Sequence, residues 1–354
     1  MVQLVETAEH RRRVVIILLA AGLAVSAYGL FQIAFQHHLW RGHYMQSTMV
    51  DRNSLGSYLV LTLGIWAGQW LGGGPRKRFV LSVAAGVLLV CLLGTTGRAA
   101  WLGGLFVLAG FAWIFLRAKP RRLQLKVALA AVAAALAMVA GLVYTASRLD
   151  VRQDFADAAG VRIWYTFNPH QPLSRLVNRR FEIWAAALDA LAAAPATGIG
   201  IGRFYASPYI VRRFGRYEHA HSYFLQIAAE VGLLGLGVWL GLLAMWLRDM
   251  RRARRAAVDG PNRWTLFGLT LGVAGYLVAE LASHSLILPV HQLLFWSVIG
   301  LGCTAFPATP LSRQAKWCLA GLVAVLAVSL WFRNPMPPAP QPSVTPAARA
   351  ATQR

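Results

Sequence analysis

Two histidines and a set of arginines are the residues of this sequence best suited to chemistry. His219 and His221 stand two residues apart, where a polar segment turns into a long apolar one. A neutral imidazole accepts a proton near pH 7 and can act as a general base. Arg98 and Arg180 lie elsewhere in the chain. A guanidinium binds phosphate through paired hydrogen bonds, so arginines suit a phosphate-bearing ligand, whereas either histidine could equally be a structural residue at a membrane boundary.

The elements that must position these residues are membrane helices. The chain has 354 residues, of which 57% are hydrophobic and 14% charged, whereas soluble domains contain about 25% charged residues. Several apolar runs approach the roughly 20 residues that span a bilayer. The net charge of +22 fits cytoplasmic loops that set orientation, and we expect no binding to nucleic acid. The sequence therefore predicts an all-α polytopic membrane protein.

About nine transmembrane helices are expected. They cover roughly 14–35, 54–71, 79–96, 99–117, 123–146, 221–247, 264–288, 291–306 and 317–332. This count puts every basic run between spans on one side, which the positive-inside rule assigns to the cytoplasm. The resulting regions are N-terminal transmembrane helices (1–146), a long outer loop (147–219), C-terminal transmembrane helices (220–332) and a disordered outer tail (333–354).

The long outer loop carries ten arginines, no lysine and six acidic residues. Either it binds a phosphate-bearing ligand, or it lies on anionic lipid headgroups. Within it, 178–194 has the periodicity of an amphipathic helix at the outer interface. This helix begins at Arg179 and Arg180, near the mouth of whatever the bundle encloses. The glycines at 198, 200 and 202, just before Arg203, indicate a tight turn rather than a nucleotide site.

The remaining candidates each have two interpretations. Arg98 follows a sharp turn between two spans on the outer face, where it either snorkels to headgroups or points into the same cavity as the loop arginines. Glu280 and His284 lie one turn apart near the outer end of the seventh span, as a local pair or as cavity-lining residues. For Glu230 we expect a structural partner. The two histidines at 219 and 221 lack a third ligand of suitable spacing, so no metal site is expected.

Four stretches together make the chain resemble the O-antigen ligase and Wzy polymerase superfamily, which includes WaaL-like enzymes. They are 49–59, 97–103, 180–204 and 221–235, in that order. Two positions depart from the usual pattern, with Gly97 where serine is usual and Ser222 where asparagine is common. The chain also has fewer spans than the ten to fourteen often found in that superfamily.

The resemblance implies a GT-C-like fold and a metal-independent, inverting glycosyltransferase of the bacterial inner membrane. Its members transfer a glycan from undecaprenyl diphosphate to a hydroxyl on a lipid, glycan or protein acceptor at the periplasmic face, with no cofactor. By this resemblance Arg98 and Arg180 would bind the diphosphate, and His221 would orient or deprotonate the acceptor. The further candidates for substrate binding are His219, Arg179, Arg203, Glu280 and His284.

Two other functions remain open at this point. One is a transporter of a small anion such as bicarbonate, with intramembrane Glu230 and Glu280 along its path. The other is a noncatalytic assembly protein of a polysaccharide export system. Ligase and polymerase are not distinguished, because both share these motifs.

Overall fold

The computed structural model describes residues 7–35, 45–117, 180–215, 218–257 and 260–306. Within these ranges the chain forms α-helices and short 3-10 helices and no strand, which confirms the all-helical prediction for this part. Two predicted spans, 123–146 and 317–332, lie outside the described residues, as do Arg179 and the predicted C-terminal tail.

The helices belong to two compact units, which we describe separately. The first unit contains α1 (Ala8–Phe35), α2 (Arg52–Leu71), α3 (Pro75–Gly94), α4 (Arg98–Arg117), α11 (Gly260–Glu280), η4 (Ser285–Ile287), α12 (Pro289–Cys303) and both ends of α10 (Tyr223–Ala256). The second contains α8 (Arg180–Ala193) from residue 182 onward, η3 (Phe204–Ala206), α9 (Pro208–Phe214) and residues 225–236 of α10.

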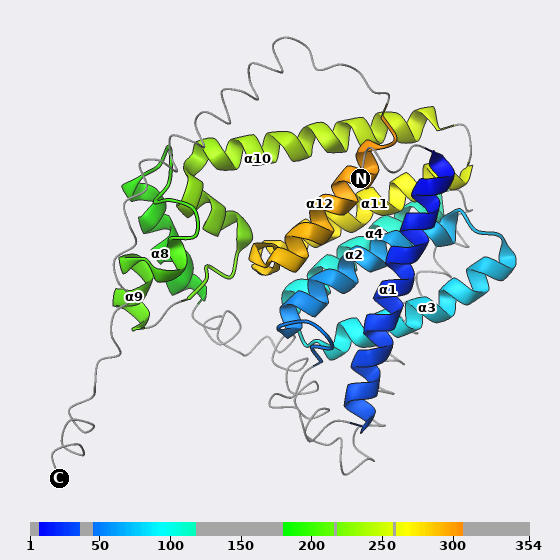
Figure 1. Ribbon diagram of the computed structural model, residues 1–354, viewed down its shortest axis with the longest axis horizontal. Coiled ribbons are helices and arrows are strands. Elements are labelled where there is room, and N and C mark those ends of the chain that lie inside the picture. Colours follow the sequence, from blue (N-terminus) through cyan, green and yellow to red (C-terminus); the bar gives the residue numbers. More distant parts are fainter. Residues whose placement is uncertain (1–6, 36–44, 118–179, 216–217, 258–259, 307–354) are drawn as a thin grey trace. The chain divides into compact units, whose positions relative to one another are not determined.

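Helices α2 and α11 form the centre of the first unit, with α1, α3, α4 and α12 around them (Figure 1). The carboxylate of Asp51 caps α2 by accepting from the backbone N–H groups of Asn53 and Ser54. Almost every residue of α2 is buried. The two central helices cross at glycines, and a Cβ added to Gly64 would overlap the backbone of Gly272. Small residues thus let α2 and α11 approach closely, as they do between the helices of membrane bundles.

Replacing Gly64 with leucine is expected to destabilise the bundle by about 3 kcal/mol or more, since neither backbone at the crossing can yield easily. Size-exclusion chromatography of the solubilised protein would measure the loss as a smaller monodisperse peak. Gly86→Leu is the matched control, because Gly86 lies on α3 with nothing within 4 Å of its position for a Cβ. Equal peaks for the two variants would contradict the close crossing.

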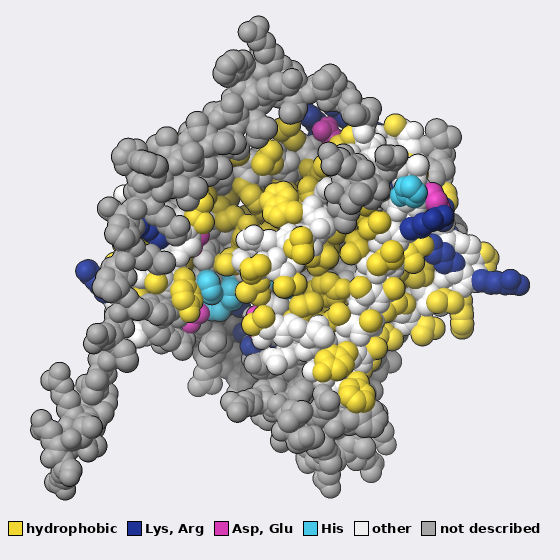
Figure 2. All heavy atoms as spheres, in the orientation of Figure 1, with side chains coloured by type: hydrophobic (Ala, Val, Ile, Leu, Met, Phe, Trp, Pro, Cys, Tyr) yellow, Lys and Arg dark blue, Asp and Glu magenta, His cyan; other side chains and the backbone are white. Residues whose placement is uncertain are grey.

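Four helices in the described part of the chain are long and apolar enough to cross a membrane. They are Ala8–Gln32, Pro75–Gly94, Arg98–Arg117 and Tyr223–Ala256. Exposed hydrophobic side chains cover much of the visible outer face of the first unit (Figure 2). They correspond to the predicted spans 14–35, 79–96, 99–117 and 221–247, with ends that differ by up to nine residues. Helices α2, α11 and α12, which cover three further predicted spans, are not among these four. A lipid environment would stabilise such a surface, since transfer of apolar side chains out of water lowers the free energy.

The seventh predicted span is wrong at its end. Its apolar run was expected to continue to residue 288, but α11 ends at Glu280 and a turn occupies 281–288. The backbone N–H of Leu286 donates to the carboxylate of Glu280, which favours this path, with its short 3-10 helix η4, over a continued α-helix. A hydropathy pattern does not register such a bond.

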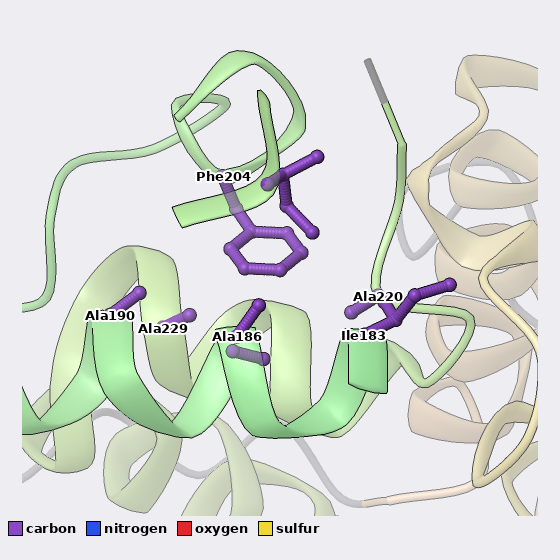
Figure 3. Close-up of a cluster of buried hydrophobic side chains, with 8 residues drawn as sticks. Ile183, Ala186, Ala190, Phe204, Ala220 and Ala229 are labelled. Atoms are coloured by element: carbon purple, nitrogen blue, oxygen red, sulfur yellow. The ribbon is translucent and has the colours of Figure 1, made fainter. Parts of the chain in front are cut away.

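The second unit has its own small core (Figure 3). The face of α8 that is buried there consists of Ile183 and alanines, and Phe204 packs over it. The helical periodicity of 178–194 predicts a buried stripe of Phe181, Trp184, Leu188 and Leu191. None of these four belongs to that buried face, and Phe181 and Leu188 are more than half exposed. Placement of that exposed stripe on a membrane interface stays a prediction.

A kink in α10 completes the second unit. Gly232 has φ +70° inside the helix, and a Cβ there would overlap the backbone of Ala196. The predicted glycine turn is confirmed, since Gly198 also has a positive φ and packs directly against the backbone of Glu230. The carboxylate of Glu230 accepts a hydrogen bond from the backbone N–H of Gly202 at 2.9 Å. The expected structural partner of Glu230 is therefore the backbone of the glycine turn.

Candidate functional site

The turn at 281–288, in the first unit, holds two elements that carry candidate residues. Nη1 of Arg180 donates to the backbone carbonyl of Ala282 at 2.7 Å. The next carbonyl, of Ser283, accepts a hydrogen bond at 2.8 Å from the backbone N–H of Tyr223, the first residue of α10. The turn therefore fixes the start of α8 and the start of α10 at neighbouring positions.

His221 lies against the same turn. Its ring centroid is 4.7 Å from that of His284, and the two rings are edge to face. His221 has φ +49°, in the left-handed region that few non-glycine residues adopt. Backbone conformations of this kind are held by surrounding structure and are common at functional sites. Arg180, His221 and His284 are thus brought together by consecutive residues of one turn.

Arg98 begins α4, directly after a sharp turn from α3, as the sequence predicted. The hydroxyl of Thr95 caps this turn by accepting from the backbone N–H of Gly97 at 3.2 Å, and Thr96 has φ +50°. Arg52, the first residue of α2, reaches the turn as well, because its Nη1 donates to the Thr96 hydroxyl at 3.2 Å.

Three guanidinium groups lie near one another in this unit. Burial lowers the pKa of Arg180, and the positive charges of Arg98 and Arg52 lower it further. Within the described residues neither Arg98 nor Arg180 forms an ion pair with a carboxylate. Clustered, partly desolvated cations repel one another, so a bound anion would relieve that repulsion. The arrangement is suited to a ligand with more than one negative charge.

Arg52 is the member of this group that sequence reasoning missed. It lies in the stretch 49–59 that carries part of the family resemblance, yet no motif singled it out. The available signal was its position at the start of a helix, next to the capping residue Asp51. Its approach to Arg180 depends on contacts between distant parts of the first unit, which no local pattern reveals.

His219 belongs to the second unit and has a different environment. Its Nδ1 lies 3.2 Å from Nε2 of Gln226, and its ring centroid lies 4.5 Å from that of Tyr205, with the two rings tilted by 33°. The Gln226 amide is oriented by two other bonds, because its Oε1 accepts from the N–H of Ala220 and its Nε2 donates to Glu230. Nδ1 of His219 therefore accepts, and Nε2 carries the proton of the neutral ring.

Burial lowers the pKa of His219, although the hydrogen bond with Gln226 and the charge of Glu218 oppose that change. The ring therefore favours the neutral form near pH 7. A neutral imidazole with its proton on Nε2 is a hydrogen-bond donor at that atom. His219 is thus better suited to donating a hydrogen bond than to removing a proton there.

The other predicted residues fall in different places. Arg203 is in the second unit, and within the described residues its buried Nε and Nη2 atoms have no hydrogen-bond partner. Glu280 is buried in the first unit, at the end of α11. Arg179 lies outside the described residues.

Residues 83–240 match the family described as Wzy_C, O-antigen ligase. The match runs from within α3 to within α10, so it includes Arg98, Arg180 and His221 but neither Arg52 nor the turn 281–288. No curated protein matches the chain. The resemblance drawn from the four motifs is confirmed over this range. With four helices able to span a bilayer, it indicates a multi-pass membrane protein.

Proposed function

From the O-antigen ligase domain at residues 83–240, we propose that this membrane protein transfers a glycan from undecaprenyl diphosphate to an acceptor hydroxyl. The observation that carries the proposal is the turn 281–288, which brings Arg180 and His221 together beside Arg98. Cations and a basic imidazole at one place are what this reaction requires.

The chemistry assigns a role to each group. The acceptor oxygen attacks the anomeric carbon of the donor, and the bond from that carbon to the diphosphate oxygen breaks, with inversion. Arg98, Arg180 and Arg52 stabilise the negative charge that grows on the departing lipid diphosphate. His221 orients the acceptor hydroxyl and takes its proton, which makes the oxygen a better nucleophile. The reaction as proposed uses no metal or cofactor.

The site is proposed to face the periplasm of a bacterial inner membrane, with the N-terminus in the cytoplasm. The support is the charge of the loops, because basic runs on the opposite side fit the positive-inside rule. The arginine-rich loop would then meet a donor whose headgroup is exposed at that face.

The test is glycan transfer by the purified protein in liposomes. A lipid-diphosphate donor and a hydroxyl acceptor should give product, while a donor of the same glycan on a lipid monophosphate should be used poorly. The reason is that a cluster of three guanidinium groups stabilises two phosphates better than one. Absence of transfer, combined with uptake of a small anion into the same liposomes, would favour a transporter instead.

A further inference from the structure

Glu280 is a buried carboxylate whose two oxygens are both engaged. Its side chain is 0% exposed at the end of α11. The hydroxyl of Ser57, on α2, donates to Oε1 at 3.0 Å. The backbone N–H of Leu286 donates to Oε2 at 3.1 Å. The carboxylate thus ties the far end of the turn 281–288 to the central helix of the unit.

Two further serines extend this arrangement into one buried network. The hydroxyls of Ser283 and Ser285 lie 2.9 Å apart, and that of Ser285 lies 3.3 Å from that of Ser57. In the part of the chain that the structure describes, no basic side chain forms an ion pair with Glu280. A buried carboxylate without a cation is costly. Its two oxygens join two parts of the unit, which points to a role in fixing the geometry there.

The same turn presents the groups that hold the candidate site. Its residue 282 accepts from Arg180, residue 283 accepts from the start of α10, and His284 lies against His221. These three residues lie between Glu280 and Leu286, the two points that the carboxylate joins. Fixing those points limits the paths that the intervening backbone can take.

We propose that Glu280 is a positioning residue that fixes the turn 281–288 and, through it, the guanidinium of Arg180 and the imidazole of His221. The inference rests on the proposed glycan transfer and deepens it by adding a residue that holds the site in place. Glu280 lies outside residues 83–240, so the family match does not cover it. Glu280 acts by accepting hydrogen bonds and takes no part in the chemical step.

Glutamine at this position separates geometry from charge. In Glu280→Gln the amide oxygen can accept from Leu286 while the NH₂ group donates to Ser57, whose hydroxyl rotates to donate to Ser285. Glu280→Ala leaves a buried N–H unsatisfied and frees the turn. We expect Glu280→Gln to retain transfer within about 5-fold of wild type, and Glu280→Ala to lose on the order of 100-fold, as misplaced catalytic groups do.

The matched control is Gln69→Ala. Gln69 is 3% exposed, and its Nε2 donates to the hydroxyl of Thr265 at 3.1 Å. It links α2 and α11 at the opposite end from Glu280, so it reports a general loss of packing between the same helices. Transfer by this variant should stay within about 3-fold of wild type. Ser57→Ala, which leaves no backbone group unsatisfied, replaces Glu280→Ala if that variant does not accumulate, with an expected loss of about 10-fold.

A double-mutant cycle with Arg180→Ala measures the coupling between the two substitutions in the rate of transfer, which general destabilisation would not produce. If Glu280 acts through Arg180, then adding Glu280→Ala to Arg180→Ala should cost much less than Glu280→Ala costs alone. Fully additive losses, a Gln69→Ala loss as large as that of Glu280→Ala, or a Glu280→Gln enzyme as inactive as Glu280→Ala would each overturn the inference. Wild-type activity of Arg180→Ala would instead remove the proposed function itself.

Discussion

Replacing Arg180 with alanine is expected to lower glycan transfer by about 10²–10³-fold, the effect of removing one preorganised donor to a developing negative charge. Arg180 is held through one nitrogen by the carbonyl of Ala282, and it has no carboxylate partner in the described part of the chain. Its remaining N–H groups can therefore serve the leaving diphosphate. The measurement is kcat/KM for the lipid-linked donor, at equal amounts of folded protein.

Two further variants give this result its meaning. Arg180→Lys keeps the charge but loses the planar pair of donors, so we expect a loss of about 10-fold, between wild type and alanine. Arg212→Ala removes an exposed arginine from α9 and should leave the rate within about 2-fold, since exposed charges contribute little. If Arg180→Ala and Arg212→Ala lose the same small amount, overall positive charge matters and the position of Arg180 does not.

The sequence was enough to predict the turn between α3 and α4 and the residues around it. Two apolar runs separated only by Thr95, Thr96 and Gly97 predict a sharp reversal of the chain. The length of the preceding run predicts that Arg98 lies at the membrane boundary. The glycine turn that begins at Gly198 was equally accessible. These are local features, determined by residues close together in the chain.

The turn 281–288 could not be predicted in the same way. The residues from Leu281 to Leu288 continue an apolar run, and hydropathy reads them as the end of a helix. What ends α11 at Glu280 is a carboxylate that joins Leu286 to Ser57, a residue more than 200 positions earlier. Long-range contacts of this kind override a local pattern, as they do for the approach of Arg52 to Arg180.

The buried face of α8 also differs from the one that the sequence predicts. Periodicity favours a face that carries Trp184 and Leu188, because large apolar residues dominate such patterns. The protein core instead receives the alanines, which allow Phe204 to pack against the backbone of the helix. Exposed Phe181 and Leu188 are then available to a membrane interface, so the same helix can satisfy a protein contact and a lipid contact on different sides.

Replacing His221 with asparagine is expected to lower transfer by about 10²–10⁴-fold while the amount of folded protein stays unchanged. Asparagine tolerates the left-handed conformation that His221 adopts at φ +49°, so the backbone is kept and the proton acceptor is removed. Alanine would remove the ring and would also be strained in this backbone conformation. A loss of activity could then come from either change. The measurement is the rate of transfer at saturating donor and acceptor, normalised to folded protein.

The pH dependence of that rate tests the same residue independently. If His221 takes the acceptor proton, the wild-type rate rises with pH because only the neutral imidazole can accept that proton, and the residual rate of His221→Asn lacks this rise. The matched control is His219→Asn, two residues away. His219 is oriented as a donor at Nε2 by its bond to Gln226, so its loss should cost less than about 10-fold and keep the pH profile. A larger loss for His219→Asn than for His221→Asn would contradict the assignment of His221 as the general base. That role would then fall to His219.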